Sequence, residues 1–465
     1  MIVSRLDSSS RRAALAIVSR LREHGHEAYF AGGCVRDLLL GSSPKDFDVT
    51  TAARPEQVMA MFSRTEAVGA HFGVVLVIDE VEGERIATEV ATFRSDGAYT
   101  DGRRPDSVLF SGDPREDVLR RDFTVNGLLL DALRFEAGEP IESCVLDFVE
   151  GRADLERRSL RAIGDPLRRF TEDKLRMLRA VRFASRLDFT IEPATMHAMQ
   201  ELAKDVLQVS PERIRDELTK ILTEGAAARG FALLDEAGLL SVVLPEVARM
   251  KGCEQPPAYH PEGDVWVHTL MLLEHLPAGA SATLAWGMLL HDIGKPPTFT
   301  PPNPDRPGDR IRFNGHAEIG VAVARSILNR LRFSNDDCAQ ILALVKHHMQ
   351  FGDVPKMKRS TLKRFLRLPR FEEHMALHYA DVMSSHGMLG PYQTAQNALE
   401  QLGHEEIRPA LLVTGENLIA AGYRPGPRFR EMLTVAEDAQ LEGTISTREE
   451  GLQLLREQFG MPDGS

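Results

Sequence analysis

The sequence predicts an α+β protein with a mixed first segment followed by a long helical remainder. Short apolar runs punctuated by glycine, which are typical of strands, are concentrated in about the first 155 residues. After that point apolar residues recur with the helical period of about 3.6 residues, almost to the end of the chain. The length of 465 residues exceeds what one hydrophobic core serves, so we expect several domains.

The first segment predicts its elements in chain order. The run AYFAGG (28–33) indicates a strand that enters a tight turn, VRDLLLG a short helix that ends at Gly41, and FDVTT a second strand. HFGVVLVID and RIATEVATF indicate two paired strands, because the polar turn sequence EVEGE separates them. We therefore expect an α/β domain in this segment.

Breaks in the helical remainder indicate domain boundaries. The stretches KGCEQPPAYHPEGD and FTPPNPDRPGD contain prolines through which a helix does not continue. LGPYQTAQ and the later GYRPGPRF set off the last 70 or so residues as a tail. We expect four domains, which span residues 1–155, 156–254, 255–390 and 391–465.

Composition narrows the class of protein and its location. The net charge of −12 argues against a uniformly basic surface that coats nucleic acid. Four scattered cysteines without a C-x-x-C pair argue against a disulfide framework or a thiolate zinc site. The chain has no leader-like start and no run near the roughly 18 apolar residues of a membrane span. We expect a cytoplasmic protein without a membrane anchor.

Asp46 and Asp48 form a candidate catalytic pair. They lie two residues apart in KDFDV, and strand geometry would point both carboxylates to one face while Phe47 and Val49 point to the other. Two such carboxylates can hold a pair of Mg²⁺ ions, one activating an attacking hydroxyl and one stabilising a pyrophosphate leaving group. For an isolated D-x-D, a solvated edge strand is the alternative.

The preceding motif GGCVRD suits phosphate binding. Gly32 and Gly33 allow the backbone to approach a ligand and expose amide donors at a helix start. Arg36 would add a forked cation for phosphate oxygens. A plain turn is the alternative for a Gly-Gly pair. Further along the chain, Glu89 in ATEVATF is a candidate third carboxylate, with an exposed strand glutamate as its alternative.

The stretch LRRDFTVNGLLLD gathers Arg120, Arg121, Asp122 and Asn126 just before an apolar run. The acidic first turn of a helix would explain Asp122 structurally. Two adjacent arginines followed by an acid that can bind a ribose hydroxyl fit a nucleotide site equally well. The residues alone leave both interpretations open.

The stretch TEDKLRMLRAVRF (171–183) predicts a helix that begins at its first residues. Asp173, Arg176, Arg179 and Arg182 recur every three residues and would project from neighbouring turns of one side. An acceptor carboxylate and a donor guanidinium one turn apart can hydrogen-bond the edge of a base. An exposed helix with i,i+3 ion pairs is the alternative.

These four motifs occur in the order and spacing of the class II tRNA nucleotidyltransferase and poly(A) polymerase family, which the chain resembles. The resemblance implies an N-terminal nucleotidyltransferase head of the polymerase β type, followed by an all-α neck, body and tail. In such a head Gly33 and Arg36 would hold the triphosphate, and Asp46 and Asp48 would carry Mg²⁺.

The resemblance also implies roles for the later two motifs. Arg121 with Asp122 would sense the ribose and phosphates. The Glu-Asp-x-x-Arg helix with Asp173 and Arg176, continued by the nucleotide-binding candidates Arg179 and Arg182, would select CTP and then ATP without a nucleic-acid template. The implied partners are tRNA, CTP and ATP, and no DNA is expected.

Two basic stretches are candidate RNA contacts. Residues 151–186 hold eleven Arg or Lys against five Asp or Glu, and residues 355–370 hold seven basic residues and no acid. Clustered cations of this kind can bind the phosphates of an RNA acceptor arm. Solvated basic faces are the alternative, because one sequence cannot align the two stretches in space.

The second half contains a different set of candidate ligands. His268 lies in PEGDVWVHTL, His291 and Asp292 are adjacent in MLLHDIGK, and Asp381 lies in HYADVMSSH. Imidazoles combined with carboxylates suit a divalent transition metal that activates water. The set resembles the HD metal-hydrolase superfamily and the HD domains fused to some bacterial tRNA nucleotidyltransferases. A buried core histidine is the alternative for each imidazole.

Further histidines would add a second ion to this set: His316 in NGHAEIG and either His347 or His348 in VKHHMQF.

The leading functional hypothesis is addition of C, C and A to tRNA 3′ ends. Poly(A) polymerase and enzymes that add only CC or only the final A are alternatives. The glycine-rich stretch FRSDGAYTDGRRPD (93–106) resembles the family's flexible loop for CTP addition and disfavours an A-only enzyme. An HD phosphohydrolase whose head docks RNA is the alternative from another class, and intact Asp46 and Asp48 argue against it. The sequence does not indicate an oligomeric state.

Overall fold

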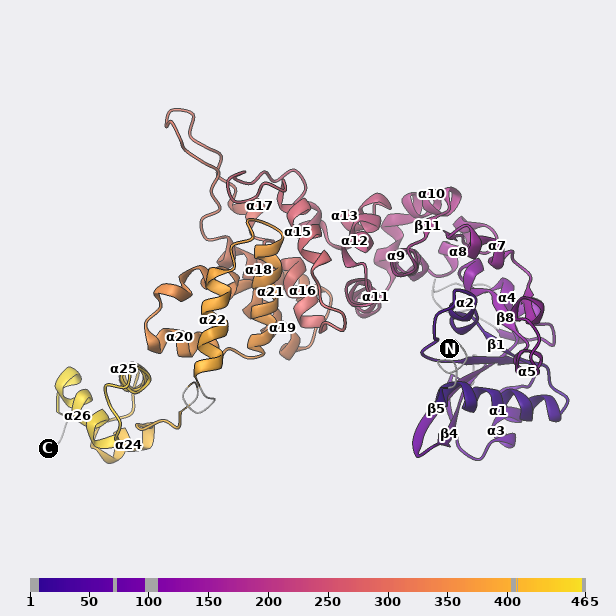
Figure 1. The fold of residues 1–465 in the computed structure, drawn as a ribbon, viewed down its shortest axis with the longest axis horizontal. Helices are drawn as coiled ribbons and strands as arrows, with labels where there is room; N and C mark the ends of the chain where they lie inside the picture. Colours follow the sequence, from indigo (N-terminus) through magenta and orange to yellow (C-terminus); the bar gives the residue numbers. More distant parts are fainter. Residues whose placement is uncertain (1–7, 70–72, 97–107, 403–406, 408, 462–465) are drawn as a thin grey trace. The chain divides into compact units, whose positions relative to one another are not determined.

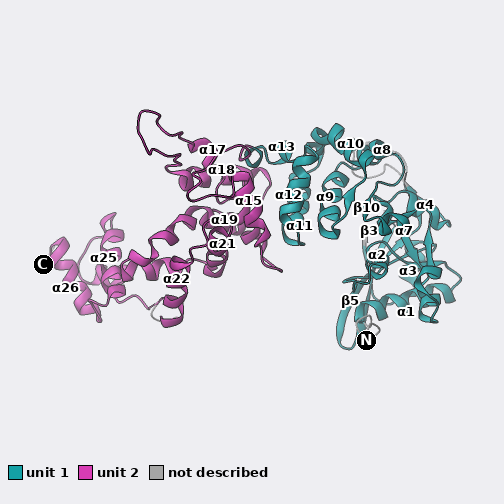
Figure 2. Cartoon of the chain, turned by 45° about the horizontal axis from the view of Figure 1, so that its top comes forward, with its two compact units in different colours: residues 1–248 teal, residues 249–465 magenta. Residues whose placement is uncertain are grey.

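The computed structural model describes residues 8–69, 73–96, 108–402, 407 and 409–461 (Figure 1). The chain divides into two compact units, Met1–Ala248 and Arg249–Ser465, which are coloured separately in Figure 2. The first unit contains a mixed sheet and a helical part, and the second is built from helices. The α+β class expected from the sequence is confirmed.

The sheet of the first unit has seven strands in the order β3-β4-β5-β2-β1-β8-β9. The strands are β1 (Ala28–Ala31), β2 (Asp48–Thr51), β3 (Thr65–Gly69), β4 (Val74–Val81), β5 (Glu84–Thr92), β8 (Leu128–Leu130) and β9 (Val145–Asp147). All pairings are antiparallel except that of β2 with β5, which is parallel. The strand that begins at Asp48 therefore lies near the middle of the sheet.

The predicted hairpin is formed by β4 and β5. Its two-residue turn consists of Glu82 and Gly83, with φ of 54° and 82°. A right-handed twist of the flanking strands favours turns in which both central residues have positive φ, so this sequence closes the hairpin without splaying it.

Helices cover the sheet and lead into the helical part of the first unit. Helix α1 packs on β1, β2, β4 and β5, and α2 packs on β1 and β8. The α-helices of this sheet-containing part are α1 (Ser9–Glu23), α2 (Gly33–Leu39), α3 (Pro55–Met61), α4 (Pro114–Leu119), α5 (Ala132–Glu136), α6 (Ile141–Cys144) and α7 (Gly151–Glu156). A separate pair, β6 (Arg94–Asp96) and β7 (Val108–Phe110), is antiparallel.

Helix α9 (Leu175–Leu187) is the centre of the helical part, where it packs against α8, α11 and α12. The expected start of this helix at residue 171 is wrong, because Thr171 and Glu172 end the preceding helix and Asp173 caps its C-terminus. The other elements are α8 (Pro166–Glu172), α10 (Pro193–Leu202), α11 (Pro211–Thr223), α12 (Ala227–Glu236), α13 (Leu240–Val243), α14 (Pro245–Ala248) and the short parallel pair β10 (Ser159–Leu160) and β11 (Thr190–Ile191).

The second unit begins with a bundle in which α15, α16, α18, α19 and α21 contact one another. These helices, with the short α17, are α15 (Val265–Glu274), α16 (Ala282–Leu290), α17 (Lys295–Thr298), α18 (His316–Arg330), α19 (Asn335–His347) and α21 (Phe371–Met383). Helix α16 is buried along almost its whole length, with Trp286 in the core. Among the described residues, no helix combines the length and apolarity that crossing a membrane requires.

The rest of the second unit surrounds two further apolar clusters, one centred on Phe351, Phe365 and Phe371 and the other on Leu418 and Leu455. Its helices are α20 (Arg359–Leu366), α22 (Gly390–Gln401), α24 (Gly415–Ala420), α25 (Arg428–Glu442) and α26 (Arg448–Phe459). Helix α20 packs against α25.

Candidate active sites

A polar cavity of about 600 Å³ lies within the first unit, between helix α9 and the end of the sheet at which β1 finishes and β2 begins. All of the residues of the first unit that were expected to bind or act on a nucleotide line it, except Arg182. Those lining residues are Gly33, Arg36, Asp46, Asp48, Arg121, Asp122, Asp173, Arg176 and Arg179. Motifs separated by up to 140 or so residues in the chain therefore meet in one cavity.

The glycine pair forms the turn between β1 and α2. Gly32 has φ of 73°, a value that L side chains rarely adopt, and a Cβ there would lie 3.1 Å from a guanidinium nitrogen of Arg121. Arg36 is buried on α2, where it donates to the Asn126 side chain at 2.6 Å and to Asp37 at 2.8 Å. The turn thus brings backbone and a fixed guanidinium to the cavity wall.

The two aspartates of KDFDV sit differently in the backbone. Asp48 opens β2, whereas Asp46 precedes the strand, so the expectation that both lie on it is wrong for Asp46. Phe47 between them is buried against Phe30 as expected, with ring centroids 5.2 Å apart. Anchoring of Phe47 leaves both aspartates exposed at the cavity.

The carboxylates at this edge repel one another. Glu89 precedes Val90, which pairs with Val49 across the parallel β2–β5 ladder. Partial burial, the charge of Glu89 and the charge of Asp46 raise the pKa of Asp48 to about 6, against the opposing pull of Arg121. Converging carboxylates whose charges raise the pKa of Asp48 are a donor set that a divalent cation would stabilise, so these residues fit the magnesium that the sequence implies.

The adjacent arginines are held by an aspartate that the sequence analysis did not select. Asp117 of α4 is completely buried and accepts hydrogen bonds from Arg120 at 2.9 Å and from Arg121 at 2.9 Å. Burial would raise its pKa, but the two guanidinium groups outweigh burial and hold the pKa below its ordinary value. Thr50 of β2 also donates to this carboxylate at 3.3 Å. Asp117 therefore couples both arginines to the strand of Asp48.

Asp122 pairs with α9 rather than with Arg121. Arg179 donates to one Asp122 oxygen through two nitrogens, at 2.9 and 2.7 Å. Burial would raise the pKa of Asp122, but the charge and hydrogen bonds of Arg179 lower it to about 2. The other Asp122 oxygen accepts from the backbone N–H of Phe123 at 2.8 Å. The head and α9 are thus joined by a buried ion pair at the cavity.

Asp173 and Arg176 both line the cavity, and their side chains bond to different partners. Arg213 of α11 donates to Asp173 at 3.0 Å. Arg176 donates to Glu172 at 2.9 Å and to the backbone carbonyl of Arg120 at 3.1 Å. An acceptor and a donor fork are therefore present side by side, each fixed by its own partners.

One expectation in this unit is not met by the cavity, and another is left untested. Arg182 is buried behind it, where it donates to Glu217 at 2.8 Å and to Glu224 at 3.1 Å, so it does not face a nucleotide. Of the glycine-rich stretch 93–106, residues 97–106 lie outside the described part of the chain.

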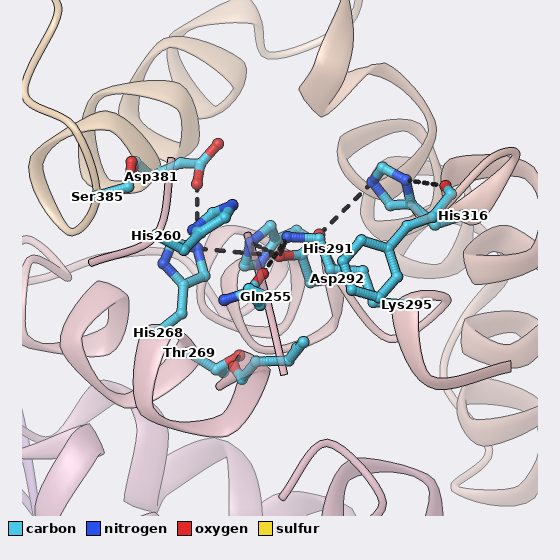
Figure 3. A network of polar contacts seen from close by, with 12 residues as sticks. Gln255, His260, His268, Thr269, His291, Asp292, Lys295, His316, Asp381 and Ser385 are labelled. Carbon is cyan, nitrogen blue, oxygen red and sulfur yellow. Dashed lines mark hydrogen bonds and ion pairs between the residues drawn. The ribbon is translucent and has the colours of Figure 1, made fainter. Parts of the chain in front are cut away.

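A cluster of histidines and carboxylates occupies the bundle of the second unit (Figure 3). All four residues expected from the sequence meet there. The His268 Nε2 atom lies 3.1 Å from Asp381 and 3.9 Å from Asp292, and the His291 Nε2 atom lies 3.2 Å from Asp292. His268, His291 and Asp381 form one group with metal-ligand spacing.

A second group consists of Asp292, His316 and His348. The Nε2 atoms of the two histidines lie 3.6 and 3.7 Å from Asp292, which is buried and stands between the groups. His348 and not His347 belongs to this group, because His347 contacts Gln350 instead. The aspartate of the His-Asp pair thus reaches both candidate ion positions.

The hydrogen bonds behind these histidines leave their Nε2 atoms available. The Nδ1 atoms of His291, His316 and His348 lie 2.9, 2.9 and 2.7 Å from backbone carbonyls, and Nδ1 of His268 lies 2.8 Å from Glu262. Such contacts fix the proton on Nδ1 and turn a lone pair on Nε2 inward. The buried Nε2 atoms of His268 and His291 make no hydrogen bond. This donor set fits a divalent transition metal.

The charges around the cluster bear on metal affinity. Burial would lower the pKa of His268, but the neighbouring carboxylates of Asp381 and Glu262 raise it to about 9. Burial lowers the pKa of His348 to about 4, so that its imidazole is neutral near pH 7. Metal binding at His268 would release a proton, and the affinity would therefore fall in acid.

The cluster opens into a cavity of about 510 Å³. Lys295 in its wall donates to Asp292 at 2.7 Å and to Gln255 at 2.6 Å. Tyr259, Arg310, Arg312 and Phe313 also contribute to this wall. Cations and aromatic rings beside a metal-binding cluster suit a small anionic ligand.

The two basic stretches differ from the expectation. In residues 355–370, Arg364 pairs with Glu437 at 2.8 Å and Asp438 at 2.6 Å, and Arg367 also pairs with Glu437. Helix α25 therefore neutralises part of that stretch, and Lys356, Lys358 and Arg359 remain exposed. In residues 151–186, Arg157, Arg158 and Arg168 are exposed, although each has a carboxylate within 3.9 Å. Several other cations of this stretch are committed to the less exposed ion pairs described above.

Three residues in or next to the cavity were not among those predicted from the sequence: Phe183 lines it, and Asp117 and Arg213 hold residues that line it. Asp117 had a local signal, because it lies three and four residues before the two arginines and an α-helix brings those positions together. Phe183 carried only the signal of an apolar helix face. Arg213 had no signal, since it reaches Asp173 from a different helix.

Three family models match the chain. The Poly A polymerase head domain matches residues 28–161, and the model described as a probable RNA and SrmB-binding site of polymerase A matches residues 188–251. The HD domain matches residues 263–384. The fold and the first cavity, together with these matches, define a nucleotidyltransferase with a fused HD domain.

Relatives that match nearly the whole chain identify the kind of nucleotidyltransferase more closely. The chain is 42% identical to a CCA-adding enzyme of Levilactobacillus brevis over 94% of its own length and 96% of that protein. It is 41% identical to a CCA-adding enzyme of Anoxybacillus flavithermus over 95% and 96%. The crystal structure of Bacillus stearothermophilus CCA-adding enzyme in complex with CTP superposes with a TM-score of 0.71 at 27% identity, covering 97% and 98% of the two chains. The chain belongs to the family of CCA-adding enzymes and is a tRNA nucleotidyltransferase.

Proposed function

We propose that this protein adds C, C and A to the 3′ ends of tRNA, using CTP and ATP and no nucleic-acid template. The observation that carries the proposal is the meeting, in one cavity, of a carboxylate pair, a glycine turn with a buried arginine, and a helix that offers an acceptor and a donor side by side. Relatives named CCA-adding enzymes that match nearly the whole chain support the same reaction. The proposal places the protein in the cytoplasm.

Each group of side chains has a part in this reaction. Asp46 and Asp48 would hold Mg²⁺, which when bound activates the terminal tRNA hydroxyl and stabilises the pyrophosphate leaving group. Gly32, Gly33 and Arg36 would bind the triphosphate through backbone amides and a guanidinium held rigid by Asn126. The reaction joins the tRNA 3′ oxygen to the α-phosphorus and releases pyrophosphate.

Selection of the base would fall to α9 and the residues just before it. The Asp173 carboxylate can accept a hydrogen bond from an exocyclic amino group, which both cytosine and adenine possess. Arg176 can donate to a ring nitrogen or carbonyl of the base. GTP and UTP would leave at least one of these groups unpaired, and such a buried group is costly. Arg213 on Asp173 and Glu172 on Arg176 would hold the pair in register.

Extension of tRNA that lacks its 3′ CCA tests the proposal. The full-length protein is incubated with this tRNA, CTP, labelled ATP and Mg²⁺, and the products are sequenced. CCA ends are expected; products that end in CC alone, in A alone or in a poly(A) tail would identify one of the alternative activities instead.

Asp46→Ala and Asp48→Ala are both expected to lower the rate of extension at least a thousandfold, because the cation is no longer held at the reacting atoms. Both aspartates are exposed, so folding should survive, and the affinity for tRNA should stay within a few-fold of wild type. Either variant retaining more than a tenth of the wild-type rate would refute the two-metal assignment.

We propose a second activity for the second unit, hydrolysis of a phosphate ester at the HD cluster. Its support is the pair of ligand groups that share Asp292, beside a cavity with cationic and aromatic walls. Metal analysis of the purified full-length protein should find a transition metal in the wild type and a strongly reduced content in His291→Ala. Phosphatase and phosphodiesterase activity should be lost with the metal. Wild-type protein that takes up no transition metal would contradict this second proposal.

A further inference from the structure

Phe183 in helix α9 is surrounded by cations at the wall of the head cavity. Its side chain lines the cavity although only 7% of the residue is exposed. The guanidinium carbons of Arg36, Arg179 and Arg182 lie 5.5, 5.1 and 4.5 Å from the centre of its ring. The edge-to-face contact with Phe123, at 5.9 Å between centroids, fixes the ring from the side of the head.

The three arginines come from different places. Arg36 lies on α2, beside the glycine turn, and Arg179 and Arg182 lie on α9. Arg36 and Arg179 line the cavity, and Arg182 is fastened behind it to Glu217 and Glu224. One ring is thus the common neighbour of a phosphate-side arginine and a base-side arginine, with a third, immobile arginine as support.

The ring of Phe183 can limit the orientations of the guanidinium groups around it. Each guanidinium group has a polar partner on one side, namely Asn126 for Arg36, Asp122 for Arg179 and Glu217 for Arg182. The ring of Phe183 is a neighbour that all three groups share. The negative face of an aromatic ring attracts each guanidinium and does so more strongly in a site that excludes water. Phe183 therefore restricts where the guanidinium groups of Arg36 and Arg179 can point.

We propose that Phe183 is a positioning residue for nucleotide addition, which holds Arg36 and Arg179 in fixed register so that the triphosphate and the base are bound at the correct separation. The proposal rests on the proposed CCA addition, because it assigns Arg36 to the phosphates. Phe183 itself transfers no proton and contacts no reacting atom in this role.

The test uses Phe183→Leu in the full-length protein. Leucine keeps an apolar side chain on the helix but has no aromatic face, so both guanidinium groups lose their common partner. The KM for CTP and for ATP is expected to rise roughly five- to thirtyfold, the range that corresponds to losing two partly buried cation–ring contacts. The kcat should stay within about threefold, because Asp46 and Asp48 are untouched. Misincorporation of GTP and UTP should increase.

Two further variants separate positioning from packing. Phe183→Tyr keeps the ring face and should restore the KM and the selectivity. Phe231→Leu makes the same change at a completely buried phenylalanine of α12 that does not line the cavity. It should lower the melting temperature and leave the KM and the selectivity unchanged. If Phe183→Leu does not fold, Phe183→Met replaces it with the same expectations.

An unchanged KM and selectivity in folded Phe183→Leu would overturn the inference. A fall in kcat alone, seen equally in Phe183→Leu and Phe231→Leu, would also overturn it, because it would indicate a general packing effect. Failure of the proposed function is seen separately, because it appears as an absence of C and A addition by the wild-type protein.

Discussion

The ion pair between Asp122 and Arg179 is the clearest case in which single residues join two parts of the first unit. Asp122 follows the arginine pair of the head and Arg179 lies on α9, so neither element can shift without breaking the pair. Because Asp122 is buried, its loss would leave the Arg179 charge without its partner. The same residues line the nucleotide cavity, so stability and substrate binding depend on one contact.

Stability should therefore depend on pH through Asp122. Its pKa of about 2 lies below the ordinary value of 3.8, so the folded state binds fewer protons than the unfolded state between these values. The contribution, about 2 kcal/mol, is fully present above roughly pH 4 and is lost as the pH falls through 2. Asp122→Asn should lower the free energy of unfolding by about this amount at pH 7.

Circular dichroism during urea titration measures this effect at pH 7 and at pH 3. The difference between wild type and Asp122→Asn should shrink at the lower pH. Asp235→Asn, which changes a half-buried aspartate of α12 that does not line the cavity, serves as a control. An equal difference at both pH values would contradict the assignment.

At the scale of elements, the short segment between α8 and α9 is where we propose that the nucleotide is selected. The helices break at Asp173, so its carboxylate faces the cavity next to Arg176 instead of following one continuous helix. Arg176→Ala should raise the incorporation of GTP and UTP relative to CTP and ATP by roughly five- to a hundredfold, since a lost hydrogen bond to a base costs about 1 to 3 kcal/mol.

Competition assays with all four nucleotides measure this ratio. The matched control is Arg115→Ala, which removes an exposed arginine of α4 that does not line the cavity. If Arg176→Ala keeps the wild-type preference and only turns over more slowly, Arg176 serves the structure or the phosphates.

Helix α21 makes the second unit sensitive to acid. His374 is completely buried and neither of its ring nitrogens has a hydrogen-bond partner. Burial, followed by the charge of His347, lowers its pKa to about 4. The folded state therefore binds fewer protons than the unfolded state between about pH 6.5 and 4, and stability falls as the pH decreases through this range.

His374→Leu should remove part of this dependence, up to about 3 kcal/mol at pH 4. Tryptophan fluorescence can follow the unfolding of the second unit, because both tryptophans of the chain, Trp266 and Trp286, belong to it. A variant with the same slope of stability against pH as the wild type would show that His374 does not titrate on unfolding.

The elements that could be predicted from the sequence are those with a local signal. The β4–β5 hairpin was predictable because the Glu82–Gly83 turn and alternating apolar residues are local signals. The break at Asp173 was missed, since the run of polar residues 171–174 reads as the start of a helix and only the packing of α8 separates it from α9. Among the site residues, motif spacing located Asp46, Asp48 and the HD ligands. The contacts of Arg213 and Phe183 depend on tertiary structure and have no local signature.

At the scale of the whole molecule, each compact unit contains its own candidate site. The nucleotide cavity is lined only by residues of the first unit and the HD cavity only by residues of the second. His291→Ala should therefore abolish metal binding at the HD cluster and leave the rate of CCA addition within about twofold of wild type. A folded His291→Ala protein that fails to extend tRNA would show that the two sites depend on each other.

The parallel pairing of β2 with β5 determines how much of the chain must be synthesised before the middle of the sheet can form. Strand β2 lies between β1 and β5, so it gains its second neighbour only when the chain as far as Thr92 has left the ribosome. The cavity needs still later residues, up to Glu224. A nascent chain thus carries Asp46 and Asp48 well before the helices that complete the cavity have been synthesised, so the cavity can form only late in translation.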